Sequence, residues 1–189
     1  MSESYAVSEK RELLLDKVKK FILDNGGIVK KSQLAGLGID YRRILDFVEK
    51  GDILRVKSGY YVVHLSDFTE EELVAKLFPD CVLNLENALY AYGYIKNKPY
   101  GWRLAVDKNT SKSRFKMDYP KIIPMYAEPE TLELGVTEIQ LSGVTVRIFE
   151  RERLICECLK YEDKMDRERF KEGLMAYFKW NRTYLRRRS

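Results

Sequence analysis

The sequence predicts an α+β protein of two domains, and three observations favour this fold class. Helical apolar patterns and a glycine-centred hairpin fill the first 65 residues. Short alternating apolar segments follow between residues 104 and 149, and two further helical patterns close the chain. We therefore expect one domain over residues 1–65 and a mixed α/β domain with closing helices over residues 66–189.

The first predicted helix covers Ser8–Asn25. Ser8 is a suitable N-terminal cap, and Gly26–Gly27 would end the helix in the manner of a C-terminal glycine cap. Apolar residues recur at helical spacing along it and predict one buried face. They are Leu14, Val18, Phe21 and Ile22.

Two shorter helices are expected next, over Gln33–Leu37 and Tyr41–Lys50. Ser32 and Asp40 can cap them, because their side-chain oxygens can accept hydrogen bonds from free backbone N–H groups. The turn between the two helices contains Gly36 and Gly38. The inward face of the later helix is expected to hold Ile44, Leu45, Phe47 and Val48.

A two-stranded hairpin follows, with strands at Ile53–Lys57 and Tyr60–Val63 and a turn at Ser58–Gly59. Helix, tight turn, helix and hairpin in this order are typical of a winged helix-turn-helix, a module that binds DNA. We assign residues 1–65 to this module.

The second domain begins after an acidic joint around Ser66–Glu72. Thr69 and Glu72 have capping-box spacing for a helix that ends at Leu77, before Pro79. The middle of residues 82–95 is expected to be helical, and residues 150–161 and 166–180 to form the closing helices. Strands are expected at Leu104–Val106, Arg114–Lys116, Ile122–Tyr126, Glu138–Leu141 and Val144–Phe149, with a hairpin turn at Ser142–Gly143.

Composition excludes several classes of protein. The chain has 189 residues, of which 45% are hydrophobic and 12% aromatic, values that argue against disorder. No apolar run approaches the roughly 18 residues that span a bilayer, and the first residues lack the order of a secretory signal. We expect a cytoplasmic protein. Its net charge of +5 is uneven, since residues 1–63 carry +3, residues 64–179 carry −2 and residues 180–189 carry +4. This distribution favours a polyanionic partner.

The sequence gives little indication of an enzyme. His64 is the single histidine, and the cysteines are Cys81, Cys156 and Cys158, which supply neither a disulfide framework nor a converging metal set. Phosphate-binding and dinucleotide-binding glycine motifs are absent. Asp107–Lys108 is the nearest candidate for nuclease chemistry and is only a two-residue coincidence. We expect no catalytic residues, no metal and no cofactor.

The DNA-contacting residues are expected at the start of the third helix, where Tyr41 and Arg42 lie opposite its apolar face and Arg43 lies alongside. An arginine can bind guanine or a phosphate through two parallel donors. Phosphate contacts are expected from the preceding helix start and from the wing. These residues are Lys30, Lys31, Ser32, Arg55 and Lys57. The alternative is a solvated helical face.

Further basic residues in the second domain could meet DNA or a protein partner. They are Lys108, Lys112, Arg114, Lys116, Arg151 and Arg153. Residues 107–121 could instead form a solvated loop, and the Glu150–Arg153 run could form local ion pairs. The arginine-rich tail, Tyr184–Ser189, is either a frayed end or an additional phosphate contact.

Three segments resemble the AbiEi antitoxins of type IV bacterial toxin–antitoxin systems. The first is RRILDFVEKGDILRVKSGYYVV, the second is ENALYAYGYI followed by WRLAV, and the third is VRIFERERLICECLKYEDKMDRERFKEGLMAYFK at residues 146–179. The third run is the most distinctive of them.

The resemblance implies a repressor that binds inverted repeats in the promoter of its own operon, with two copies on the DNA. It also implies a second domain that counteracts a nucleotidyltransferase-like toxin in abortive infection, with or without direct contact. A plain winged-helix regulator with a ligand-sensing or dimerisation domain stays open, as does an enzyme with a DNA-targeting head. A membrane role is not expected.

Overall fold

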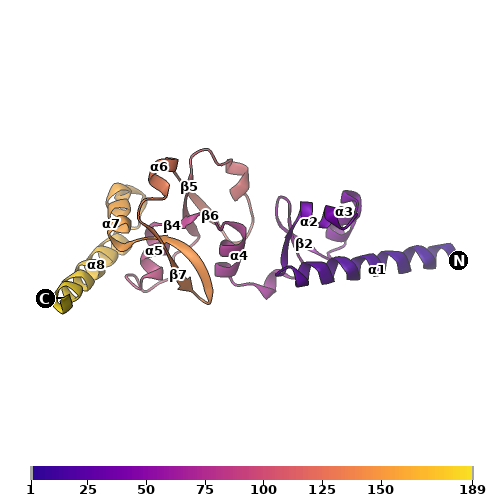
Figure 1. Ribbon diagram of the computed structural model, residues 1–189, viewed down its shortest axis with the longest axis horizontal. Coiled ribbons are helices and arrows are strands. Elements are labelled where there is room, and N and C mark those ends of the chain that lie inside the picture. Colours follow the sequence, from indigo (N-terminus) through magenta and orange to yellow (C-terminus); the bar gives the residue numbers. More distant parts are fainter. Residues whose placement is uncertain (1, 189) are drawn as a thin grey trace. The chain divides into compact units, whose positions relative to one another are not determined.

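The computed structural model describes residues 2–188, and the side chains of residues 8–184. The chain is mixed α/β and forms two compact units (Figure 1). One unit contains the residues up to Thr69 together with 116–119, and the other contains residues 70–115 and those from 120 onwards. In the described part of the chain, the helices are all too short or too polar to cross a membrane.

The first unit combines three helices with a small antiparallel sheet, shown in indigo and purple in Figure 1. The sheet has the strand order β1-β3-β2. Its helices are α1 (Ser2–Asp24), α2 (Lys31–Gly36) and α3 (Tyr41–Glu49), and its strands are β1 (Ile28–Lys30), β2 (Leu54–Lys57) and β3 (Tyr60–Val62). One apolar core draws on the three helices, on β1 and β3, and on Ile53 just before β2. It includes Val18, Ile22, Val29, Leu34, Ile44, Phe47, Ile53 and Tyr61.

Local sequence signals account for most of this unit. Asp40 caps α3 as predicted, since its side chain accepts a hydrogen bond from the backbone N–H of Arg42 at 3.1 Å. Gly59 takes a φ of +78° in the predicted hairpin turn, a conformation that suits glycine. Ile44 and Phe47 are each 1% exposed and form the predicted inner face of α3.

Two predictions for this unit were wrong in detail, and one strand was missed. Helix α1 begins at Ser2, so Ser8 lies inside it and is not its cap; residues 2–7 contain no glycine or proline to stop the helix. Helix α2 begins at Lys31 with Lys30 as its cap, and the backbone N–H of Lys30 donates to Gln33 Oε1 at 2.8 Å. Strand β1 was not predicted, because three residues are too few to show a period.

The second unit is built on a five-stranded mixed sheet with the order β6-β5-β4-β8-β7. Its strands are β4 (Val82–Leu83), β5 (Trp102–Asp107), β6 (Ile122–Ala127), β7 (Val136–Leu141) and β8 (Val144–Phe149). Its helices are α4 (Glu70–Leu77), α5 (Leu85–Ala91), α6 (Pro129–Leu132), α7 (Arg151–Lys160) and α8 (Arg167–Arg188). Helices α7 and α8 are the two predicted closing helices, and α8 continues beyond its predicted end (Figure 1).

One predicted strand of the second unit is absent. Arg114 and Phe115 belong to a 3-10 turn, η2 (Lys112–Phe115), instead of a strand. Here a tertiary contact outweighs the local pattern, because Phe115 is buried and stacks on Phe78 with ring centroids 5.6 Å apart. The predicted hairpin turn at Ser142–Gly143 is confirmed, with φ values of +50° and +86°.

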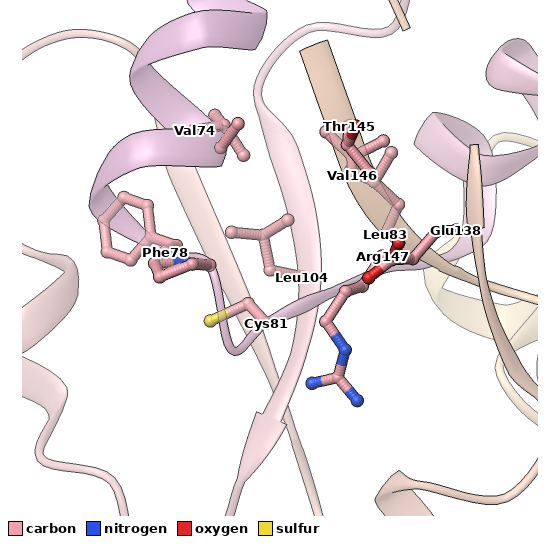
Figure 2. Close-up of a pocket in the computed structure, with 11 residues that line it drawn as sticks. Val74, Phe78, Cys81, Leu83, Leu104, Glu138, Thr145, Val146 and Arg147 are labelled. Carbon is pink, nitrogen blue, oxygen red and sulfur yellow. The ribbon is translucent and has the colours of Figure 1, made fainter. Parts of the chain in front are cut away.

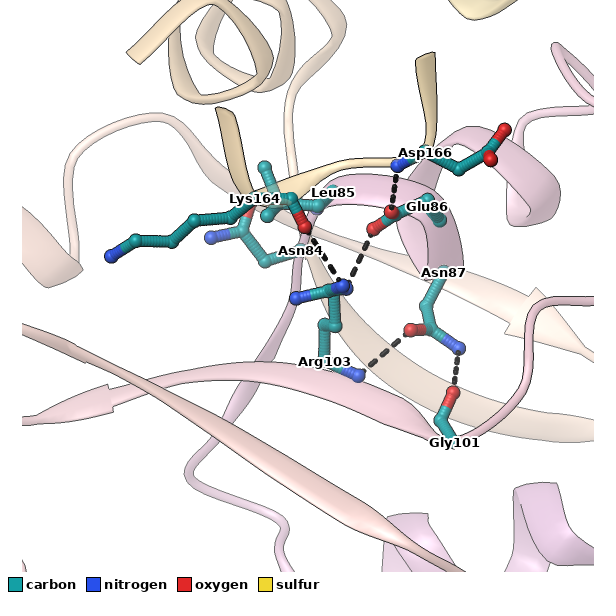
Figure 3. A network of polar contacts seen from close by, with 8 residues as sticks. All are labelled: Asn84, Leu85, Glu86, Asn87, Gly101, Arg103, Lys164 and Asp166. Atoms are coloured by element: carbon teal, nitrogen blue, oxygen red, sulfur yellow. Dashed lines mark hydrogen bonds and ion pairs between the residues drawn. The ribbon is translucent and has the colours of Figure 1, made fainter. Parts of the chain in front are cut away.

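A buried polar network fixes the centre of this unit (Figure 3). Glu86 on α5 is 3% exposed, and its carboxylate lies 2.7 Å from Arg103 Nε on β5. The Arg103 guanidinium also donates to the backbone carbonyl of Lys164 at 3.0 Å, ahead of α8. Asn87 accepts from the backbone N–H of Arg103 at 2.7 Å and donates to the carbonyl of Gly101 at 3.1 Å. These bonds tie the helical layer to the sheet.

Candidate nucleic-acid interface

The exposed surface of the first unit gathers most of the residues that the sequence nominated. Seven of the eight nominated side chains are exposed. They are Lys30, Lys31, Ser32, Tyr41, Arg42, Arg43 and Arg55. They come from β1, from the first turns of α2 and α3, and from β2.

Five of these residues form what we call the unpaired basic set: Lys30, Lys31, Arg42, Arg43 and Arg55. Among the side chains that the structure describes, no carboxylate oxygen lies within 4.0 Å of their charged nitrogens. Their positive charges are therefore open to an external anion.

The acidic residues of the first unit help to explain why this set is unpaired. Asp46 lies near the other end of α3, where it binds Arg11 Nε at 2.9 Å and Lys50 Nζ at 2.9 Å. Asp52 also binds Arg11. The hydrogen bond with Lys50, and to a smaller extent the one with Arg11, holds the pKa of Asp46 below its usual range. The carboxylates are thus used to join α1 to α3, and the first turn of α3 contains no acidic residue.

Tyr41 lies where the elements of this surface meet. Lys31 Nζ is 3.7 Å from the centroid of its ring, which brings the start of α2 against the start of α3. The backbone N–H of Lys31 also donates to the carbonyl of Gly59 at 2.8 Å, so that α2 is bonded to the hairpin turn. The N-terminal ends of both helices and the hairpin are therefore held together.

Lys57 differs from the other seven nominated residues. Its side chain is buried at 6% exposure, and its ammonium lies 4.6 Å from the centroid of the Tyr60 ring. Strict alternation would place Arg55 and Lys57 on the same side of β2, but the register with β3 shifts between them. Such a bulge turns one side chain away from the other. We therefore exclude Lys57 from the residues proposed to contact DNA.

The six basic residues nominated in the second domain do not form a comparable set. Lys108 binds Glu128 at 2.5 Å, Arg153 binds Glu157 at 2.8 Å, and Arg114 binds Asp80. Lys112 and Lys116 are exposed. Arg151 lies between two rings, with its guanidinium carbon 4.3 Å from the Tyr92 centroid and 4.6 Å from the Trp180 centroid. The side chains of Arg186, Arg187 and Arg188 lie outside the described residues.

The second unit contains a pocket that the sequence did not predict (Figure 2). It lies between α4 and the sheet and has a volume of about 240 Å³. Val74, Phe78, Leu104 and Val146 give it an apolar lining, while Glu138 and Arg147 bring charges from the two neighbouring strands β7 and β8. Helical spacing of Val74 and Phe78 could have indicated the helix wall, but a pocket needs the sheet beneath it as well.

Within the described part of the chain, no group of three or more His, Cys, Asp or Glu side chains could hold a metal ion. Cys156 is exposed, whereas Cys81 and Cys158 are buried. Burial raises the pKa of Cys158 to about 12, so its thiol stays protonated at neutral pH.

Residues 16–64 match a protein-family model described as a transcriptional regulator, the AbiEi antitoxin. The predicted resemblance is thereby confirmed over this segment. The matched segment runs from within α1 through β3 and contains the whole unpaired basic set. No functionally curated protein matches the chain. The resemblance of the two later segments stays a prediction.

Proposed function

We propose that the protein is a DNA-binding antitoxin that represses its own operon through inverted repeats in the promoter. The observation that carries the proposal is the unpaired basic set. It lies on the ends of α2 and α3 and on the hairpin, within the segment that matches the transcriptional regulators. The three helices and the β2–β3 hairpin support a winged helix-turn-helix, with the hairpin as the wing.

In the proposed complex, the N-terminal end of α3 enters the major groove. Arg42 and Arg43 contact base edges, since a forked guanidinium matches the acceptors of guanine. Lys30, Lys31 and Arg55 bind phosphates on either side and set affinity and register. Inverted repeats require two copies of the protein on the DNA, one for each half-site.

The second unit is proposed to counteract a nucleotidyltransferase-like toxin, as in a type IV system that acts in abortive infection. The family description of residues 16–64 as an antitoxin regulator supports this role. Co-expression of the protein with a nucleotidyltransferase encoded beside it tests the role. Restored growth supports neutralisation, and continued growth arrest by a demonstrably active toxin contradicts it.

The DNA-binding role is tested by fluorescence anisotropy with the DNA upstream of the gene. A scrambled duplex of equal length is the control, and both are measured at two salt concentrations. We expect tight binding to the upstream DNA and weaker, strongly salt-dependent binding to the control. Equal binding to both duplexes would contradict a promoter-specific repressor.

A second candidate function is favoured by the pocket between α4 and the sheet. A cavity of about 240 Å³ exceeds the roughly 150 Å³ of an apolar cavity that binds benzene. The second unit could therefore sense a small apolar ligand in a plain transcription regulator. An Ala75→Phe variant would obstruct the pocket. If a small apolar ligand changes DNA binding by the unmodified protein but not by this variant, the ligand-sensing regulator is favoured. If the variant still neutralises the toxin, the antitoxin is favoured.

A further inference from the structure

Tyr41 contacts a neighbouring element of the proposed interface, which a residue that only reads a base would not need to do. It is the first residue of α3, it is 39% exposed, and its ring faces the ammonium of Lys31 at 3.7 Å. A cation centred over an aromatic face at this distance is held by the quadrupole of the ring. The ring that could stack against DNA is thus already occupied on one face by a residue of α2.

The same side chain also reaches the hairpin. Tyr61 on β3 is only 1% exposed, and burial raises the pKa of its hydroxyl, which the neighbouring Tyr41 raises further. Arg55 stands opposite Tyr61 in the register of β2 and β3. Tyr41 therefore links Lys31 on α2, the start of α3, and the strand pair that carries Arg55.

We propose that Tyr41 is a positioning residue, which holds the Lys31 ammonium beside the start of α3 and fixes α3 against the hairpin. This inference rests on the proposed DNA-binding function and replaces the expectation that Tyr41 itself contacts DNA. Arg42 and Arg43 keep the base-reading role. Tyr41 acts through Lys31, and its contribution is the same for every DNA sequence.

The physical advantage of this arrangement is preorganisation. A free lysine loses much of its side-chain entropy when it binds a phosphate, and that loss subtracts from the affinity. In this protein the ring restricts Lys31 before DNA arrives. Binding then gains affinity without any new base contact.

A double-mutant cycle separates positioning from base reading. We would compare Lys31→Met, Tyr41→Leu and the double variant for binding to the upstream DNA and to a scrambled duplex. Each single variant should lower the salt slope by about one, and the double variant should lower it no further. Lys30→Met is the matched control. Lys30 lies 6.0 Å from the ring of Tyr60 and not against Tyr41, so its effect should add to that of Tyr41→Leu.

Two results would overturn the inference. One is a Tyr41→Leu effect that adds fully to that of Lys31→Met, and the other is loss of discrimination at a single base pair of the operator. Tyr41→Phe keeps the ring and should retain the salt slope of the unmodified protein. Equal thermal unfolding midpoints for the variants would exclude misfolding as the cause of a loss.

An NMR measurement on the free protein tests the geometry independently of DNA. The ε protons of Lys31 should be shifted upfield by the ring current of Tyr41, and Tyr41→Leu should remove the shift. If this shift is present but the protein shows no preference for its upstream DNA, the proposed function fails while the contact stands. If the shift is absent, the positioning role fails whatever DNA the protein prefers.

Discussion

Four arginines of the second unit and the unpaired basic set of the first unit differ in their pairing with carboxylates. In the second unit, Arg103, Arg114, Arg147 and Arg153 each have a carboxylate within 4.0 Å. In the first unit, the unpaired basic set has none among the described side chains. Both units contain many lysines and arginines, so the number of basic residues does not distinguish them. The positions of the carboxylates do distinguish them, and they leave the charges of the unpaired basic set open to a partner.

Pairing also distinguishes charged residues that stabilise the fold from those proposed to bind a partner. Glu86 and Arg103 form a largely buried ion pair that joins α5 to β5, with Arg103 Nε 2.7 Å from the carboxylate. Removing one partner of such a pair leaves an uncompensated charge in the interior. An exposed, unpaired arginine can be removed with little effect on folding. Four predictions follow this division from the largest expected effect to the smallest.

Arg103→Met should destabilise the second unit by about 3–5 kcal/mol, because it leaves the Glu86 carboxylate buried without its partner. Chemical denaturation measures the change. Lys108→Met is the matched control, since its pair with Glu128 is 49% and 57% exposed. The control should lose no more than about 1 kcal/mol. Equal losses in both variants would refute the distinction between buried and surface pairs.

Arg42→Ala or Arg43→Ala should each weaken operator binding by roughly 1–3 kcal/mol and leave stability within about 0.5 kcal/mol. The reason is that neither guanidinium has a carboxylate partner to lose. Anisotropy titrations and thermal unfolding on the same preparations give the two quantities. Unchanged operator affinity in both variants would show that α3 is not the recognition helix.

Lys31→Met and Lys57→Met should differ in the salt dependence of DNA binding. The exposed Lys31 is proposed to bind a phosphate, so its loss should lower the salt slope by about one. Lys57 is buried against Tyr60, and its loss should leave the slope unchanged. A lower slope for Lys57→Met would mean that Lys57 reaches the DNA after all.

The ion pairs of Asp46 should give the first unit a small pH dependence of stability. The folded-state pKa of Asp46 is lowered, chiefly by Lys50 and then by Arg11. Its stabilising contribution is therefore complete above the unfolded value of about 3.9 and is lost as the pH falls toward the lower folded value. In the Asp46→Asn variant, the unfolding midpoint should change less between pH 5 and pH 3 than in the unmodified protein. An identical pH profile for both would contradict this assignment.

The sequence predicted those features of the structure that depend on residues close together along the chain. The Asp40 cap, the glycine turns and the apolar face of α3 are local features, and the structure confirms them. Strand β4 has two residues and is defined only by its partners β5 and β8, so no local period could reveal it.

The exposure of the nominated residues was predictable for the same reason, with Lys57 as the exception. Exposure of Arg42 and Arg43 follows from helical spacing, but the burial of Lys57 follows from a bulge that alternation cannot anticipate. Ion pairing was also beyond the sequence pattern, because Arg114 and its partner Asp80 lie 34 positions apart. Only the folded chain shows which basic residues are neutralised.

The most direct test of the account compares two double variants in binding to the upstream DNA. One is Arg42→Ala with Arg43→Ala in the unpaired basic set, and the other is Lys108→Ala with Lys112→Ala in the second unit. Both pairs remove two positive charges. We predict that the first variant loses its preference for the upstream DNA over a scrambled duplex, while the second keeps it. Equal loss in both would show that the protein binds DNA through its overall charge and that the unpaired basic set has no special role.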